Sequence, residues 1–160
     1  MAARVYTASG SKVYIAPSVA TEPANAAAYA ALTWTEVTAI ESIGEFGDQA
    51  GIVTGAVIGD GRARKGKGTA NAGDLTITCF HNPEDAGQAA MLAAASPGSN
   101  VNYPFKIVIG NRLSGSGTDE INYFIGLVTS ARINVGNNEN LVRITYATSV
   151  NSKLTTVAPT

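Results

Sequence analysis

Apolar residues alternate with polar ones through most of the second half of the chain, and this period of two constrains the fold more than any other feature. Side chains of a β-strand point to opposite faces in turn, so the pattern predicts strands with one buried face. Three such strands are predicted over residues 101–109, 121–134 and 142–150, and a shorter one over residues 74–79. A sheet with a covered face therefore has to be the centre of the fold.

The first half of the chain shows weaker strand patterns, and one clear helix signal lies between the two halves. Strands are predicted near residues 12–16 and, with imperfect alternation, over 34–46, while residues 19–32 predict a loop with one helical turn. The helix signal has Asn82 as its N-cap and Pro83 at its first position.

The predicted total is about six to seven mostly antiparallel strands with one flanking α-helix, which indicates an all-β-dominated sandwich or barrel. We expect residues 1–150 to form a single domain, because a chain of 160 residues suits one core. Residues 151–160 show no strand or helix pattern and predict a flexible C-terminal tail.

A segment over residues 48–73 is dense in glycine and shows no clear periodicity. Such a long loop within a compact domain is functional or disordered. It carries the basic residues Arg62, Arg64, Lys65 and Lys67. They form either a solvated mobile loop or an arm that docks by its charge on an acidic surface of a neighbouring subunit. Nucleic-acid binding by this run ranks third, since no aromatic residues are interleaved with the charges.

The sequence carries little charge, which indicates assembly. Charged residues make up 14% of the chain and the formal net charge is −1, whereas soluble domains average about 25% charged residues. A surface with so little charge defends poorly against association. The alternative is an ordinary small domain rich in Ala, Gly and Thr. No apolar run approaches the roughly 18 residues that span a bilayer, so we expect no membrane insertion.

Patterns that carry chemistry are missing from the sequence. A single histidine, His81, and a single cysteine, Cys79, cannot form a zinc site of ordinary spacing. Residues 61–67 fit the start of a phosphate-binding loop, but Gly68 stands where that loop needs Ser or Thr, and a strand follows instead of a helix. We therefore expect no catalytic site, no metal and no cofactor.

Several motifs recur in a familiar order and spacing over about residues 30–150. The segments are Trp34-Thr35-Glu36-Val37, Ile43-Gly44-Glu45-Phe46, the run from Lys65 to Thr78, the helix around Asp85 to Leu92, Tyr103-Pro104-Phe105-Lys106-Ile107, the run from Phe124 to Ser130, and Asn140 to Thr148. In this order they resemble the major tail tube proteins of long-tailed, non-contractile bacteriophages, the lambda-like group.

The resemblance implies a sandwich with one helix, assembled as hexameric rings that stack into the hollow tail tube. It implies self-association, contacts with tape measure, tail terminator and tail tip proteins, and passage of double-stranded phage DNA. We expect assembly in the host cytoplasm and a final location in the virion tail. The family places a loop equivalent to residues 48–73 between successive rings, which favours the docking-arm interpretation.

A conduit for DNA must touch the polymer without holding it, since every phosphate that Lys or Arg neutralises adds affinity. We therefore expect polar strand faces to line the bore. The candidates for facing the lumen are Glu45, Asp74, Thr76, Thr78 and Asn122. Arg132 and Arg143 also lie on polar strand faces, and we expect them to point outward or to pair with acids.

Two alternatives stay open at this point. The first is a tube ring of a related bacterial secretion or injection system. The second is a monomeric β-sandwich that serves as a binding or decoration module. Such a module should present an exposed aromatic platform, whereas Trp34 and the tyrosines fall mainly in strand patterns.

Overall fold

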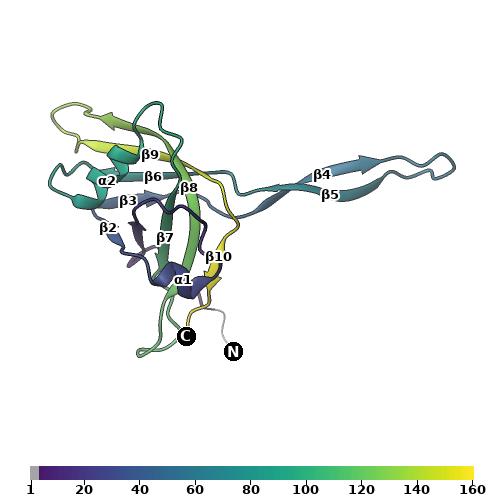
Figure 1. Ribbon diagram of the computed structural model, residues 1–160, viewed down its shortest axis with the longest axis horizontal. Coiled ribbons are helices and arrows are strands. Elements are labelled where there is room, and N and C mark those ends of the chain that lie inside the picture. Colours follow the sequence, from purple (N-terminus) through teal and green to yellow (C-terminus); the bar gives the residue numbers. More distant parts are fainter. Residues whose placement is uncertain (1–3) are drawn as a thin grey trace.

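The computed structural model describes residues 4–160, and it shows one large antiparallel sheet from which a long hairpin projects (Figure 1). The elements in chain order are β1 (Lys12–Ile15), α1 (Ala26–Ala30), β2 (Thr35–Val37), β3 (Ile40–Ile43), β4 (Gln49–Gly55), β5 (Arg64–Asn71), β6 (Asp74–Phe80), α2 (Ala86–Ala94), β7 (Tyr103–Ile109), β8 (Glu120–Asn134), β9 (Arg143–Val150) and β10 (Thr155–Val157). We call β4, β5 and their connecting turn the arm, and the remainder the body.

The body sheet has the strand order β2-β1-β7-β8-β9-β6-β3, with β10 paired to β8 beside this path. The 15-residue strand β8 joins two halves of the sheet. Its residues 120–126 pair with β7, while residues 126–134 pair with β9. A register shift between Val128 and Ser130 marks a bulge in the β8–β9 pairing, and bulges bend strands and increase their twist.

The core receives the buried face of strands from both halves of the sheet. It includes Val13 and Ile15 of β1, Leu75, Ile77 and Cys79 of β6, Phe105 and Ile107 of β7, Phe124 of β8, and Ile144 and Tyr146 of β9. The rings of Phe105 and Phe124 stack with centroids 5.3 Å apart. The alternation that predicted the strands is thus the alternation of buried and exposed side chains.

A smaller apolar cluster covers another part of β8. Tyr29 of α1 stacks on Tyr123, with ring centroids 5.1 Å apart, and Trp34 packs beside them. The indole Nε1 of Trp34 donates to the Tyr29 carbonyl at 3.0 Å. Asn25 caps α1 by accepting from the Ala28 amide at 2.9 Å. The predicted helical turn within residues 19–32 is confirmed.

Helix α2 begins later than the sequence pattern predicts. Asp85 is its N-cap and accepts from the Gln88 amide at 2.7 Å. Asn82 instead closes the preceding turn, because its side chain accepts from the Glu84 amide at 3.1 Å. The prediction of Asn82 as the N-cap is wrong. Asp85 prevails because its carboxylate also accepts from the amide and hydroxyl of Thr38, which ties the helix to the β2–β3 turn.

The mostly β, antiparallel fold class is confirmed, with 42% of residues in strands and 9% in helices. Within residues 4–160 there are ten strands instead of six or seven. The predicted strand over residues 34–46 is divided into β2 and β3. The extended backbone is interrupted between them, where Ala39 takes a positive φ of 56°.

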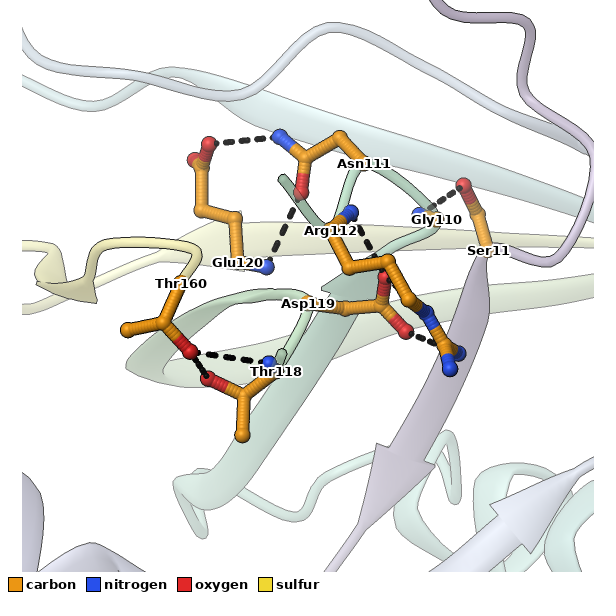
Figure 2. Close-up of polar contacts among 8 residues, drawn as sticks. All are labelled: Ser11, Gly110, Asn111, Arg112, Thr118, Asp119, Glu120 and Thr160. Atoms are coloured by element: carbon orange, nitrogen blue, oxygen red, sulfur yellow. Dashed lines mark hydrogen bonds and ion pairs between the residues drawn. The ribbon is translucent and has the colours of Figure 1, made fainter. Parts of the chain in front are cut away.

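The prediction of a flexible tail over residues 151–160 is wrong in the described structure. Strand β10 pairs with residues 121–123 of β8, and Leu154 and Val157 pack against the two apolar clusters. Thr160 joins the β7–β8 connector, since its amide donates to the Thr118 carbonyl at 3.0 Å and its hydroxyl accepts from the Thr118 amide at 2.9 Å (Figure 2). Two isolated apolar residues are too few to reveal a three-residue strand in the sequence.

The β7–β8 connector is also closed by side-chain pairs across its base (Figure 2). The Arg112 guanidinium lies 2.9 Å from the Asp119 carboxylate. Asn111 donates to Glu120 at 3.0 Å and accepts from the Glu120 amide at 2.9 Å. Hydrogen bonding to the Arg112 side chain lowers the pKa of Asp119. This end of the body is therefore held by polar contacts in place of an apolar core.

Candidate assembly surfaces

The arm is an antiparallel two-stranded sheet that stands away from the body (Figure 1). Its register pairs Ile52 with Lys67, Val53 with Gly66, and Thr54 with Lys65. The prediction of an irregular loop over residues 48–73 is therefore wrong. Neither face of the arm is buried in the subunit, so the sequence has no alternation that would reveal its strands.

The arm exposes apolar side chains that the body would bury. The exposed fractions are 72% for Ile52, 61% for Val53, 55% for Val57 and 105% for Ile58. Two paired strands alone are marginally stable in water. Exposed aliphatic residues gathered on such a hairpin are typical of an interaction surface.

The predicted docking residues lie together on the arm. Arg64 pairs with Asp60 at 2.7 Å. Among residues 4–160, the ion pairs involve none of Arg62, Lys65 and Lys67. Lys65 and Lys67 lie two residues apart on one strand and so share a face with Ile52 and Thr54. The arm thus combines unpaired positive charge with bare apolar surface.

The outer face of β6 and β9 is small and polar, and we call it the polar face. Its side chains are Asp74, Thr76 and Thr78 on β6, paired across the strands with Ser149, Ala147 and Thr145 on β9. The Ser149 hydroxyl donates to Asp74 at 2.6 Å, and the hydroxyls of Thr78 and Thr145 lie 3.4 Å apart. Three of the five predicted lumen residues therefore share one surface.

The other two lumen candidates lie elsewhere. Glu45 is exposed between β3 and the arm, where it borders a depression with Asp48 and Asp74. Asn122 is only 3% exposed and hydrogen-bonds to Glu120 at 2.9 Å and Thr156 at 2.6 Å. A side chain buried within its own subunit cannot line a channel, so the prediction for Asn122 is wrong.

The reason lies in the pattern of β8. Residues of like parity on a strand share a face, and Phe124 and Val128 therefore share the side of Asn122 near that part of the strand. Both are buried in the main core. The alternate set Tyr123 and Ile125 is buried as well, in the smaller cluster. This half of β8 is covered on both faces. The polar side chain of Asn122 therefore does not mark an exposed face of the strand.

Arg143 and Arg132 both lie beside the polar face, and their partners differ. Arg143 forms two hydrogen bonds with Glu41, at 2.6 and 2.8 Å. The hydrogen bonds lower the pKa of Glu41 and raise the pKa of Arg143. The expectation that Arg143 pairs with an acid is confirmed. Arg132 lies opposite Thr145 and takes part in none of the ion pairs within residues 4–160. Sequence reasoning did not identify Glu41, which lies at the register shift between Ile40 and Ser42.

Unpaired strand edges flank the polar face on both sides. Strand β3 ends the sheet order, and in the described chain its only partner is β6. Residues 127–134 of β8 pair with β9 on one edge, while the β7 pairing stops at Gly126. Four strands, β3, β6, β9 and the end of β8, thus form a patch of sheet that another chain can extend at either side.

A metal-binding cluster and a membrane-spanning helix are both absent from residues 4–160. No group of three or more His, Cys, Asp or Glu residues could hold a metal ion. Burial raises the pKa of the Cys79 thiol to about 11, so this group stays protonated near neutral pH. Neither helix in the described part of the chain is long and apolar enough to cross a membrane.

Solved structures with the same fold come from a phage tail tube and from contractile injection systems. A chain of the SPP1 tail tube has 15% sequence identity and a TM-score of 0.64, over 92% of this chain and 76% of that one. A chain in the anti-feeding prophage baseplate has 10% identity and a TM-score of 0.68, over 99% and 98%. A chain in the extended-state sheath/tube terminator of an extracellular contractile injection system, PVC, has 8% identity and a TM-score of 0.70, over 99% and 100%.

No protein-family model matches the chain, and no curated protein matches it in sequence. At identities of 15% and below, the structural likeness establishes the fold. The chain therefore shares its mostly β, antiparallel fold with a tail tube protein and with components of contractile injection systems.

Proposed function

We propose that this chain is the repeating subunit of a phage tail tube, built from hexameric rings that stack into a hollow conduit for DNA. The observation that carries the proposal is the polar face with an unpaired strand edge on each side. The tail tube fold supports it, since the SPP1 structure is that of a tail tube.

Ring formation follows from the two edges. When β3 of one copy lies against residues 127–134 of the next, each copy extends its neighbour's sheet by backbone hydrogen bonds. The contact is head to tail, because the two edges differ, and it closes when the rotation between copies completes a circle. A closed barrel has no unpaired edge left, which removes the hazard of open-ended aggregation.

The polar face then becomes the wall of the bore. Asp74, Thr76 and Thr78 present one carboxylate and two hydroxyls, and Glu41 neutralises Arg143 beside them. A wall of small polar groups with few free cations touches DNA without retaining it. Glu45 remains a candidate for the rim of the bore at the base of the arm.

The arm makes the contact between successive rings. Its cations Arg62, Arg64, Lys65 and Lys67 and its bare aliphatic residues are covered when the next ring docks. A tube of this kind ends on tail terminator and tail tip proteins and encloses a tape measure protein, and these are the partners we propose. The proposed location is the virion tail, after assembly in the host cytoplasm.

A second candidate is the inner tube of a contractile injection system. The likeness to the anti-feeding prophage and PVC chains favours it, with coverage of 99% of this chain in both cases. The candidates differ in what surrounds the tube, because a contractile system needs an outer sheath. Tubes that recruit a sheath protein encoded beside this chain would favour the second candidate.

Electron microscopy of the purified protein over a wide concentration range tests the proposal. We expect rings and, at high concentration, hollow tubes of constant width. The double variant Lys65→Ser, Lys67→Ser should keep the thermal unfolding of the wild type and raise the concentration needed for tubes about tenfold, since each of two docked charge pairs contributes about 0.7 kcal/mol and about 1.4 kcal/mol is a factor of ten.

The matched control removes two lysines from the body, Lys12→Ser and Lys153→Ser, and should assemble as the wild type does. A protein that stays a compact monomer at every concentration would contradict the tube. Tubes of normal length from the Lys65, Lys67 variant would contradict a docking role for these charges while leaving the tube itself in place.

A further inference from the structure

The arm and an apolar hollow lie at opposite ends of the same strands. Strand β6 starts at Asp74, directly after the arm, and ends at Phe80, from which the chain continues through His81 toward α2. In Figure 1 the arm extends to the right of the body, while α2 and the neighbouring ends of β6 and β9 lie at the left.

The hollow has a volume of about 250 Å³ and lies between α2 and the adjoining ends of β8 and β9. Its apolar lining includes Leu92, Ile133, Ile144 and Tyr146. Leu92 is 49% exposed and Ile133 is 51% exposed, so its rim is open to another molecule. The Nδ1 atom of His81, another lining residue, is buried without a hydrogen-bond partner among the described residues.

Further apolar side chains extend this surface beyond the hollow. Val135 is 64% exposed and Leu141 is 65% exposed, both in the β8–β9 turn. The His81 amide donates to the Val142 carbonyl at 2.9 Å, which places that turn beside the hollow. Exposed apolar side chains therefore gather at this end of the body, and apolar surface of this kind marks interaction sites.

The end of the arm is apolar, like the lining of the hollow. Val57 and Ile58 lie in its turn, where the Asp60 amide donates to the Val57 carbonyl at 3.0 Å. Ile58 is fully exposed at 105%. Gly59 has a φ of 102°, a backbone conformation that glycine adopts without strain, and it lets the chain reverse with Ile58 at the tip.

Charge also favours the pairing of these two ends. The arm carries Arg62, Lys65 and Lys67 without ion-pair partners in residues 4–160, while Glu84, next to the lining residue Pro83, and Glu139 are exposed carboxylates without ion-pair partners in the same residues. Glu84 precedes α2 and Glu139 lies in the β8–β9 turn. An arm with positive charge behind an apolar tip fits a hollow with acidic surroundings.

We propose that Val57 and Ile58 of one copy insert into the hollow beside α2 of a second copy in the next ring. This inference rests on the proposed tube and names the surface that receives the arm. Because the inserting and receiving surfaces lie at opposite ends of one subunit, each copy offers a tip to one neighbour and a hollow to another. Such a contact is head to tail and repeats along an axis without limit.

Cysteine cross-linking tests the contact directly. In the double variant Ile58→Cys, Leu92→Cys, the two thiols lie on adjoining copies, and oxidised glutathione converts them to a disulfide. Assembled tubes should then give a ladder of covalent oligomers on a denaturing gel without reductant. Each single variant has one introduced thiol per chain and should stop at the dimer, since Cys79 is buried.

The matched control is Ile58→Cys with Leu113→Cys, because Leu113 is also 49% exposed but lies in the β7–β8 connector. This variant should give no ladder. A ladder from the control as strong as that from the Leu92 variant, or no ladder from tubes of the Leu92 variant, would overturn the proposed contact.

Assembly measurements separate this inference from the proposed function. Ile58→Asp and Leu92→Asp should each raise the concentration needed for tubes about tenfold or more, since a charge then enters an apolar contact. Leu113→Asp should leave it unchanged. Wild-type protein that forms no tubes would refute the proposed function and the docking contact together. Tubes that form equally well from Ile58→Asp and Leu92→Asp would refute the docking contact alone.

Discussion

The body and the arm are both antiparallel sheet, yet they differ in what covers their side chains. Ile77 in β6 has no exposed surface, whereas Ile52 in β4 is 72% exposed. Backbone pairing runs along the strands in both places, without a break between β6 and β9 and with one register shift in the arm between Ala50 and Ile52. The difference teaches that backbone pairing is enough to form strands in this chain, whereas burial of one face of the sheet supplies most of the stability.

The same two regions differ in how they treat charge. In the body, Lys12 pairs with Glu36 at 3.3 Å, Arg112 with Asp119 at 2.9 Å and Arg143 with Glu41 at 2.6 Å. In the arm only Arg64 is paired, at 2.7 Å. The arm therefore carries both exposed apolar surface and charge without an ion-pair partner among the described residues, which is what the proposed contact between copies requires.

The largest expected difference in stability between the two regions comes from replacing one glycine in each by alanine. A Cβ atom at Gly87 in α2 would overlap the Glu36 carbonyl and lie 2.6 Å from the Val37 Cα, so helix and strand must separate. A Cβ atom at Gly66 in the arm would meet nothing within 4 Å. Gly87→Ala should lower the free energy of unfolding by about 2 kcal/mol, while Gly66→Ala should change it by less than about 1 kcal/mol.

Urea unfolding followed by fluorescence of Trp34, the one tryptophan of the sequence, measures both variants. The gain in helix propensity from Gly to Ala, about 1 kcal/mol, acts against the clash at Gly87 and is already counted in the expected value. Equal unfolding midpoints for the two variants would mean that α2 does not pack closely on β2.

The contrast between covered and bare strands also explains what the sequence could predict. Strands β6, β7, β8 and β9 begin and end within two residues of their predicted ranges, because one face of each is buried and the alternation records it. In the arm Ile52 and Val53 are adjacent and both exposed. Without a buried face there is no periodic pattern to detect, and the arm was predicted as a loop.

Site residues follow the same rule. Asp74, Thr76 and Thr78 were predicted together because they alternate with buried residues of one strand, and the structure places them on one face. Asn122 lies in a part of β8 that is covered on both sides, which only the tertiary structure reveals. The Glu41–Arg143 pair joins residues 102 positions apart, and no local pattern connects them.

The next prediction concerns the ion pair that neutralises Arg143 beside the proposed bore. Glu41→Gln leaves Arg143 unneutralised next to the polar face, whereas Glu36→Gln frees Lys12 on β1, in the other half of the sheet. Each added phosphate contact raises DNA affinity in a salt-dependent way. Tubes of the Glu41 variant should bind short duplex DNA about tenfold more tightly at low salt than tubes of the Glu36 variant.

Wild-type tubes should show no measurable duplex binding near physiological salt. Binding of DNA to each tube preparation, measured over a series of salt concentrations, gives both the affinity and its salt dependence. Tight, salt-dependent binding by wild-type tubes would contradict a non-adhesive bore and would point first to Arg132, which has no carboxylate partner in the described chain.

The smallest effects are expected when one ion pair is removed from each region, by Asp119→Asn in the body and by Asp60→Asn in the arm. Asp119 accepts from the Arg112 side chain and backbone amide, and hydrogen bonding to that side chain lowers the pKa of Asp119 below its ordinary 3.8. A carboxyl whose pKa is lower in the folded state contributes stability above its unfolded pKa and loses it as pH falls through the folded value. Asp119→Asn should therefore reduce the free energy of unfolding near neutral pH, and the difference from wild type should shrink below about pH 4.

Asp60→Asn also removes an ion pair, the one with Arg64 at 2.7 Å, but that pair lies in the arm and touches no part of the core. The unfolding of the body should therefore match the wild type at every pH. Chemical unfolding at a series of pH values measures both. A loss of stability from Asp60→Asn as large as that from Asp119→Asn would mean that the arm unfolds together with the body, and the separation between the two regions would then fail as an account of this chain's stability.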